Sequence, residues 1–159
     1  MEKPVLDPAS GGRMFYFDRD DDRVVFGDIR TMEPTVLSNG QTLEVRPDIL
    51  MDFRALPFED GRFRLVIFDP PHLDNLGENA WMRTKYGFLG SSWRDDLAAG
   101  FRECFRVLAP YGVLIFKWAE VRIPVSEVLA LTPERPLIGH KSGRQAKTHW
   151  IAFMKGGEA

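Results

Sequence analysis

The sequence has one cysteine, no long apolar run and almost no net charge, and each shortage excludes a class of protein. With Cys104 alone among 159 residues, neither an intramolecular disulfide nor a four-thiolate metal cage can form, which favours a reducing compartment. No apolar run approaches the roughly 20 residues that a membrane-spanning helix needs. The first residues also lack the basic, apolar and small-residue order of a signal peptide. We therefore expect a cytoplasmic protein with no membrane association.

The chain does contain enough apolar and aromatic material for one core. A length of 159 residues with 44% hydrophobic residues, 12 Phe and 4 Trp suits one globular domain, because domains commonly have about 100 to 150 residues. No repeat or low-complexity linker divides the sequence. We therefore predict a single domain over residues 1–159.

The net charge of −2 conceals an uneven distribution. Residues 1–60 carry 7 basic and 13 acidic side chains, whereas residues 61–159 carry 14 basic and 10 acidic ones. A polyanion is attracted by clustered cations rather than by a neutral average. Any nucleic-acid partner is therefore expected to contact the second part of the chain.

Four short apolar runs, each followed by an aspartate, predict buried strands. They are Val5–Leu6 before Asp7, Val24–Phe26 before Asp28, Ile49–Met51 before Asp52, and Leu65–Phe68 before Asp69. Continuous apolar runs suit strands that are buried on both faces, as in a parallel sheet covered by helices. Ligands of such sheets bind beyond the carboxyl ends of the strands. The four aspartates are therefore expected to share one ligand-binding edge.

Residues 91–109 change to a helical period, with apolar residues at spacings of three and four: Leu97, Phe101, Cys104, Phe105 and Leu108. Ser91 or Ser92 is predicted to cap this helix and Pro110 to end it. A buried strand at 113–116 completes a strand–helix–strand unit. A hairpin across 35–45, a short helix near 126–131 and strands near 137–138 and at 149–154 complete the prediction. The fold class is α/β, three-layered and doubly wound, with a mostly parallel sheet.

Two loops carry the chemistry. The loop 7–13, DPASGGR, has the small residues of a nucleotide-binding turn but not the glycine spacing of a dinucleotide or NTP phosphate loop, which favours a ligand with adenosine and no phosphates. The prolines after Asp69 fix φ and remove two N–H donors, leaving rigid carbonyl acceptors beside a carboxylate. Such a group is suited to hold the two N–H bonds of an amino group.

Taken in order, these motifs resemble the class I S-adenosylmethionine-dependent methyltransferases, in particular the amino-methyltransferases with an Asp/Asn-Pro-Pro-aromatic motif. The resemblance covers nearly the whole chain through VLDPASGG, VVFGD, DILMDFRALPFEDGRFRLVIFDPP and FRVLAPYGVLIFKW. The small size and the opening DPASGGRMFYFD are also similar to methyltransferases of phages and prophages. The resemblance implies a Rossmann-like methyltransferase fold with an antiparallel last strand.

The resemblance also implies a role for each motif position. The methionine part of S-adenosylmethionine would be bound by Asp7, Ala9, Ser10 and Gly11, its ribose by Asp28, and its adenine by Asp52 and Phe53. The catalytic group would be Asp69, Pro70, Pro71 and His72, with Asp69 and the Pro70 carbonyl holding the target amine. No metal is required, because the cofactor is already activated. The expected reaction is methyl transfer to an exocyclic amine, adenine N6 or cytosine N4 of DNA or RNA.

Two positions depart from the family pattern. Arg13 stands where many members have glycine, and His72 stands where the family has an aromatic residue that stacks on an extruded base. The second departure leaves open a small molecule or a protein amide as the acceptor. A cofactor-binding subunit without activity of its own, serving a larger complex, is a further alternative.

Two segments of the basic part combine cations with aromatic side chains, as nucleic-acid surfaces do. One follows the catalytic motif and the other precedes the last strand. The residues expected to contact the substrate are Trp81, Arg83, Lys85, Lys141 and Arg144. No separate recognition domain fits in the remaining length, so sequence choice would come from these loops, a partner subunit or a homo-oligomer.

Overall fold

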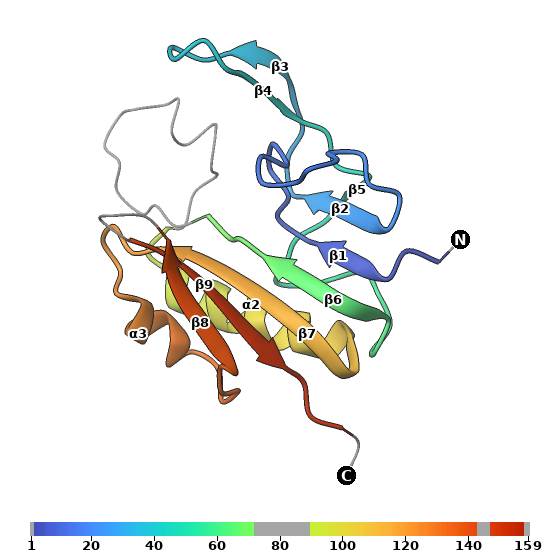
Figure 1. Ribbon diagram of the computed structural model, residues 1–159, viewed down its shortest axis with the longest axis vertical. Helices are drawn as coiled ribbons and strands as arrows, with labels where there is room; N and C mark the ends of the chain where they lie inside the picture. The colour runs from blue at the N-terminus through green and yellow to red at the C-terminus, as the bar shows by residue number, and fades with distance from the viewer. Residues whose placement is uncertain (1, 72–89, 143–146, 158–159) are drawn as a thin grey trace.

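The computed structural model describes residues 2–71, 90–142 and 147–157, which build a seven-stranded sheet with helices packed on one face (Figure 1). The strands in spatial order are β5 (Ile49–Leu50), β2 (Val24–Asp28), β1 (Val5–Asp7), β6 (Phe63–Phe68), β7 (Leu108–Ala119), β9 (Thr148–Met154) and β8 (Ile138–Ser142). β5, β2, β1, β6 and β7 run parallel, and β9 lies antiparallel between β7 and β8. This topology confirms the predicted Rossmann-like class with an antiparallel last strand.

The strand order reverses beside β1, and this position determines where a ligand can bind. From β1 the chain goes outward to β2 and β5, then returns to β6 and β7 on the other side. The loops that leave the carboxyl ends of β1 and β6 therefore diverge and open a crevice. The predicted loop 7–13 leaves the end of β1 and Asp69 follows the end of β6, so the fold brings the two motifs to one crevice.

Helix α2 (Trp93–Val107) lies against the sheet through the predicted apolar stripe. Leu97, Phe101 and Cys104 are buried, and the Phe101 and Phe116 ring centroids are 4.9 Å apart. Burial raises the pKa of the Cys104 thiol, which fits its predicted role as a small core residue. Within the described residues, no helix is long and apolar enough to cross a membrane.

The ends of α2 differ from the prediction. Ser92 stands at the N-cap, but its hydroxyl contacts the Asp96 carboxylate at 2.9 Å instead of capping a backbone N–H. The helix ends at Val107 rather than at Pro110, because Leu108 has an extended backbone and already begins β7. Leu108 matches the apolar spacing of the helix although it belongs to β7, because the first residue of this strand is also buried.

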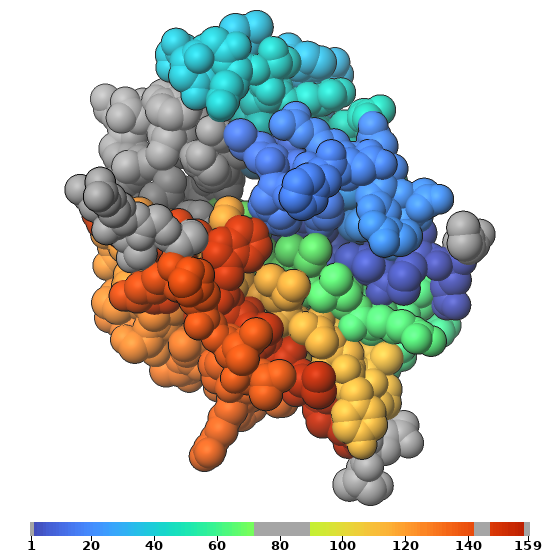
Figure 2. Space-filling model, in the orientation of Figure 1, coloured from blue at the N-terminus to red at the C-terminus, as the bar shows by residue number. Residues whose placement is uncertain are grey.

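The sheet face opposite α2 is covered differently from a doubly wound sheet with helices on both sides. Helix α3 (Val125–Leu129) lies on the same side as α2 (Figure 1). The connection 8–23 between β1 and β2 contains no helix and folds as an irregular loop over the other face, where Phe15 packs edge-on against Trp150. Figure 2 shows this blue loop meeting the red atoms of β9.

The connection from β2 to β5 is a β-hairpin. Its strands β3 (Met32–Val36) and β4 (Thr42–Val45) pair antiparallel, in the region where a hairpin was predicted across 35–45. Leu43 and Val45 are buried and anchor the hairpin, whereas most of β3 is exposed. In Figure 1 the hairpin projects beyond the carboxyl edge of the large sheet, so it borders the crevice at this edge.

Candidate functional site

A cavity of about 420 Å³ occupies the crevice at the carboxyl edge, within the size range of small-molecule sites. Predicted site residues that line it are Ala9, Ser10, Gly11, Asp28, Asp52, Phe53, Asp69, Pro70 and Pro71. Further wall residues that sequence reasoning did not identify include Met14, Phe15, Ile29, Arg30, Arg54, Asp96 and Lys117. The cavity therefore joins the predicted cofactor motifs to the predicted catalytic motif.

The loop after β1 is held close to the end of β2. Gly11 has φ +48° and its N–H donates to Asp28 Oδ2 at 2.9 Å, while the Ser10 N–H donates to the Gly27 carbonyl at 2.8 Å. The Ser10 hydroxyl is buried and has no hydrogen-bond partner among the residues that the structure describes. Because a buried hydroxyl without a partner is costly, Ser10 is a group that a polar ligand can satisfy.

Asp28 organises the wall between this loop and the hairpin. Besides Gly11, its carboxylate accepts the Arg30 backbone N–H at 3.1 Å and lies 3.4 Å from the Arg30 guanidinium. A carboxylate offers about four lone-pair sites, so acceptor capacity remains for hydroxyl groups. Ile29 adds apolar surface to the same wall.

Another part of the cavity wall contains a second ion-pair network. Arg54 contacts Asp52 at 2.6 Å and Asp96 at 3.1 Å, which ties the segment after β5 to the first turn of α2. Hydrogen bonds from Arg54 hold the pKa of Asp52 below its usual value. Asp52 is therefore an ionised acceptor at neutral pH, and the neighbouring Phe53 ring packs edge-on against Phe68, 5.2 Å between centroids.

Asp7, predicted to bind the cofactor directly, lies behind the cavity wall. It is fully buried, and its carboxylate accepts the Tyr16 hydroxyl at 2.9 Å and the Ala9 N–H at 3.2 Å. Asp7 is the last residue of the central strand β1, and Tyr16 covers its side chain. Asp7 thus shapes the loop from beneath, and burial raises its pKa to about 7.

We expect Asp7→Asn to stabilise the protein at about pH 8 and to lose that advantage progressively toward about pH 4. The native carboxyl keeps its proton up to about pH 7, whereas the unfolded chain releases it near 3.8. The native state therefore binds the extra proton, and Asp7 favours folding less and less as the pH rises between these values. The full difference is on the order of 2–4 kcal/mol. Urea unfolding across this range measures it, and a pH-independent difference would contradict the assignment.

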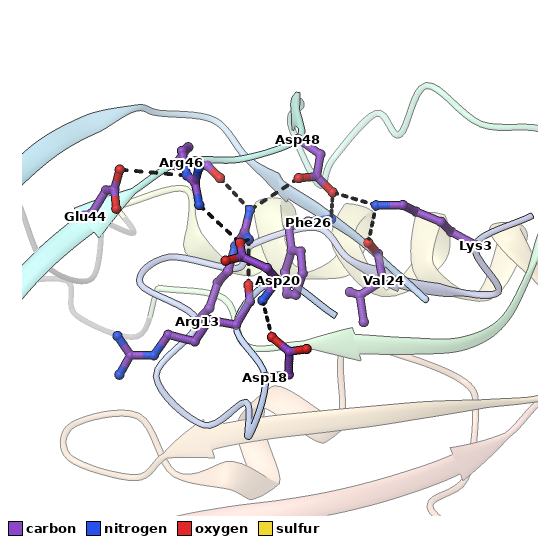
Figure 3. Close-up of polar contacts among 10 residues, drawn as sticks. Lys3, Arg13, Asp18, Asp20, Val24, Phe26, Glu44, Arg46 and Asp48 are labelled. Carbon is purple, nitrogen blue, oxygen red and sulfur yellow. Dashed lines mark hydrogen bonds and ion pairs between the residues drawn. The ribbon is translucent and has the colours of Figure 1, made fainter. Parts of the chain in front are cut away.

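Arg13 occupies a glycine-like backbone position, with φ +52°. Its guanidinium turns away from the cavity into the polar cluster of Figure 3, where it donates to the Arg19 carbonyl at 2.6 Å and the Arg46 carbonyl at 2.5 Å. It also pairs with Asp20 at 3.0 Å and Asp48 at 3.4 Å, and lies 3.8 Å above the centre of the Phe26 ring. At this position, where glycine was expected from the resemblance, the chain thus has a residue that fastens the loop 7–13 to the neighbouring segments.

The Asp69 carboxylate is paired with a lysine that sequence reasoning missed. Lys117 Nζ lies 2.9 Å from Asp69 Oδ2, and both residues line the cavity. The register Phe68↔Phe116 between parallel β6 and β7 places the next residue of each strand side by side. A lysine inside the apolar strand LIFKWA was the available sequence signal.

Among the described residues, none of those predicted to bind the substrate lines the cavity. Lys141 is exposed on β8, 3.9 Å from Glu120, and does not line the cavity. His72, Trp81, Arg83, Lys85 and Arg144 lie outside the described residues. His149, from the second basic segment, is buried and bonded to Glu120 at 2.9 Å, which gives it a structural role.

The strand order and the position of the cavity define the class: the chain has the Rossmann-like fold of S-adenosylmethionine-dependent methyltransferases. It is similar to the PH0226 protein of Pyrococcus horikoshii, with TM-score 0.60 and 18% identity, covering 95% of this chain and 81% of that one. It is also similar to S-adenosylmethionine-dependent methyltransferases of Methanosarcina mazei (TM-score 0.58, 12% identity, 97% and 92% covered) and Thermotoga maritima (0.56, 10%, 98% and 83%). At these identities the similarity establishes the fold. No protein-family model and no curated protein matches the sequence.

Proposed function

We propose that the protein is an S-adenosylmethionine-dependent methyltransferase that methylates an exocyclic amine, adenine N6 or cytosine N4 of DNA or RNA. The observation that carries the proposal is that Asp69, Pro70 and Pro71 line the same cavity as the Ser10–Gly11 loop. One chamber can therefore hold a cofactor and an amine together, and positioning of this kind supplies much of the rate enhancement of a transfer reaction.

The cofactor end of the cavity suits S-adenosylmethionine by its chemistry. The Ser10 hydroxyl and the Gly11 turn fit the polar methionine part, and the Asp28 carboxylate fits ribose hydroxyls. Ile29 and Phe53 offer apolar surface for adenine, and ionised Asp52 offers an acceptor beside them. When bound, the cofactor supplies a methyl group on a sulfonium, which departs as a neutral thioether when an amine lone pair bonds to the methyl carbon.

The acceptor end then needs only to hold a neutral amine and receive its proton. Asp69 and the Pro70 carbonyl accept the two N–H bonds, which directs the nitrogen lone pair along one line. The nitrogen becomes cationic as the methyl group arrives, so the Asp69 carboxylate favours this change and takes up the released proton or passes it to water. Pro71 keeps the chain rigid at this point.

The test is incubation of the purified protein with methyl-labelled S-adenosylmethionine and separate pools of DNA, RNA, protein and metabolites. We expect label on adenine or cytosine amino groups in nucleic acid. Label found only in protein or in metabolites would show that the acceptor is not a nucleic acid. Cofactor binding with no label in any pool would favour a subunit without activity, and absence of cofactor binding would reject the whole proposal. Mass spectrometry of the denatured protein for copurified S-adenosylhomocysteine gives an independent check of binding.

A further inference from the structure

We propose that Lys117 determines the class of acceptor: its ammonium group holds one Asp69 oxygen in place, and its charge excludes amines that are cationic at pH 7. The inference rests on the proposed function and adds to it. It identifies the substrate as a neutral amine conjugated to a ring or carbonyl, as in nucleobases, and excludes alkylammonium groups such as those of lysine side chains and polyamines.

The first support is the position and burial of the pair. Lys117 Nζ and Asp69 Oδ2 are 2.9 Å apart, with side chains only 23% and 17% exposed. Charges shielded from water interact more strongly than exposed ones, so the ammonium is a substantial part of the field at Asp69. An amine that reaches Asp69 must come close to this ammonium.

The second support is that aromatic rings restrict the ammonium group. Lys117 Nζ lies 5.3 Å from the centre of the Phe15 ring and 5.5 Å from that of Trp150. Both distances fall within the range of cation–π attraction. Phe15 comes from the loop 8–23 and Trp150 from β9, so separate elements hold the lysine and oppose its withdrawal when a second cation approaches.

The third support is the charge balance of the described cavity wall. Its carboxylates are Asp28, Asp52, Asp69 and Asp96, and its cations are Arg30, Arg54 and Lys117. Each cation contacts at least one of these carboxylates, in the pairs Arg30–Asp28, Arg54–Asp52, Arg54–Asp96 and Lys117–Asp69. These wall residues thus carry a net charge of −1. The net positive charge of the bound cofactor would balance it. A cationic acceptor would add a charge that these groups do not compensate.

The experiment compares two acceptors: an oligonucleotide that the wild-type protein methylates, and poly-lysine. We expect the wild-type protein to label the oligonucleotide and to use poly-lysine at least about 100-fold less well. In Lys117→Met the oligonucleotide rate should fall about tenfold, and the use of poly-lysine relative to the oligonucleotide should rise about tenfold, because Asp69 then faces the acceptor without its ammonium partner. Lys117→Arg should restore the exclusion.

Lys155→Met is the matched control, since Lys155 donates to the Leu108 carbonyl at 2.6 Å near the start of β7, the opposite edge of the sheet. Its selectivity should equal that of the wild-type protein. If thermal melting shows that Lys117→Met does not fold, Lys117→Gln gives the same comparison. Efficient labelling of poly-lysine by the wild-type protein, or an unchanged ratio in a folded Lys117→Met or Lys117→Gln variant, would overturn the role of Lys117 and leave the methyltransferase proposal intact. Failure of the wild-type protein to bind cofactor or label any pool would instead overturn the proposed function.

Discussion

Replacing Asp69 by alanine is expected to lower kcat for methyl transfer roughly a thousandfold while leaving cofactor affinity within about threefold. The carboxylate lines the cavity beside Lys117 and is proposed to hold the acceptor, whereas the Ser10–Gly11 loop is proposed to bind the cofactor. Alanine removes the acceptor of an amine N–H and also leaves the lysine charge uncompensated. The amine then loses its alignment and also meets an unpaired ammonium group.

Asp69→Asn is the matched comparison, because asparagine keeps an oxygen acceptor of the same reach but no charge. We expect its kcat to lie between those of the wild-type protein and the alanine variant. Rates are measured by label transfer to the acceptor that the pool experiment identifies, and cofactor dissociation constants by calorimetry. An alanine variant with near wild-type kcat would remove Asp69 from the proposed mechanism, and an equal loss of cofactor affinity would indicate a collapsed cavity.

Replacing Arg13 by alanine is expected to lower the free energy of unfolding by about 2–3 kcal/mol. The Arg13 side chain is 9% exposed and serves two backbone carbonyls, two carboxylates and the Phe26 ring. Asp20 and Asp48 are 71% and 37% exposed, so water can solvate them after the change. Most of the loss therefore comes from the two carbonyls and from packing on Phe26.

Arg13→Gly separates the side-chain contacts from the backbone. Because φ is +52°, glycine relieves a conformation that costs other residues about 1 kcal/mol, so the glycine variant should be more stable than the alanine variant but less stable than the wild-type protein. Arg23→Ala is the control, since Arg23 is 73% exposed and pairs locally with Asp21, and it should leave the free energy of unfolding close to that of the wild-type protein. Urea unfolding gives all three values, and an alanine variant as stable as the control would show that the cluster of Figure 3 contributes little.

Much of the cavity at the carboxyl edge of the sheet was predictable, because apolar runs in the sequence indicate where the strands end. The apolar runs ending at Asp28 and Asp69 form β2 and β6, and parallel strands bring such ends to one edge. Spacing could not reveal that the Asp7 side chain turns inward beneath Tyr16, since a strand-end aspartate reads the same whether it faces a ligand or the core. The predicted end of α2 lies C-terminal to the observed one, because an apolar residue at Leu108 fits both the helical period and the pattern of the next strand.

The α/β class, the buried strands and the motifs that carry the proposed chemistry could be predicted from the sequence, because these depend on local periodicity and on residues close together in the chain. The pairing of charges, in contrast, depends on how the chain folds. Lys117 is 48 residues from Asp69, and Arg13 is 35 from Asp48. Such pairs depend on strand register and loop path rather than on spacing along the chain. The Asp69–Lys117 pair, which lies where the acceptor is proposed to bind, and the anchoring of the loop 7–13 are therefore properties of the fold.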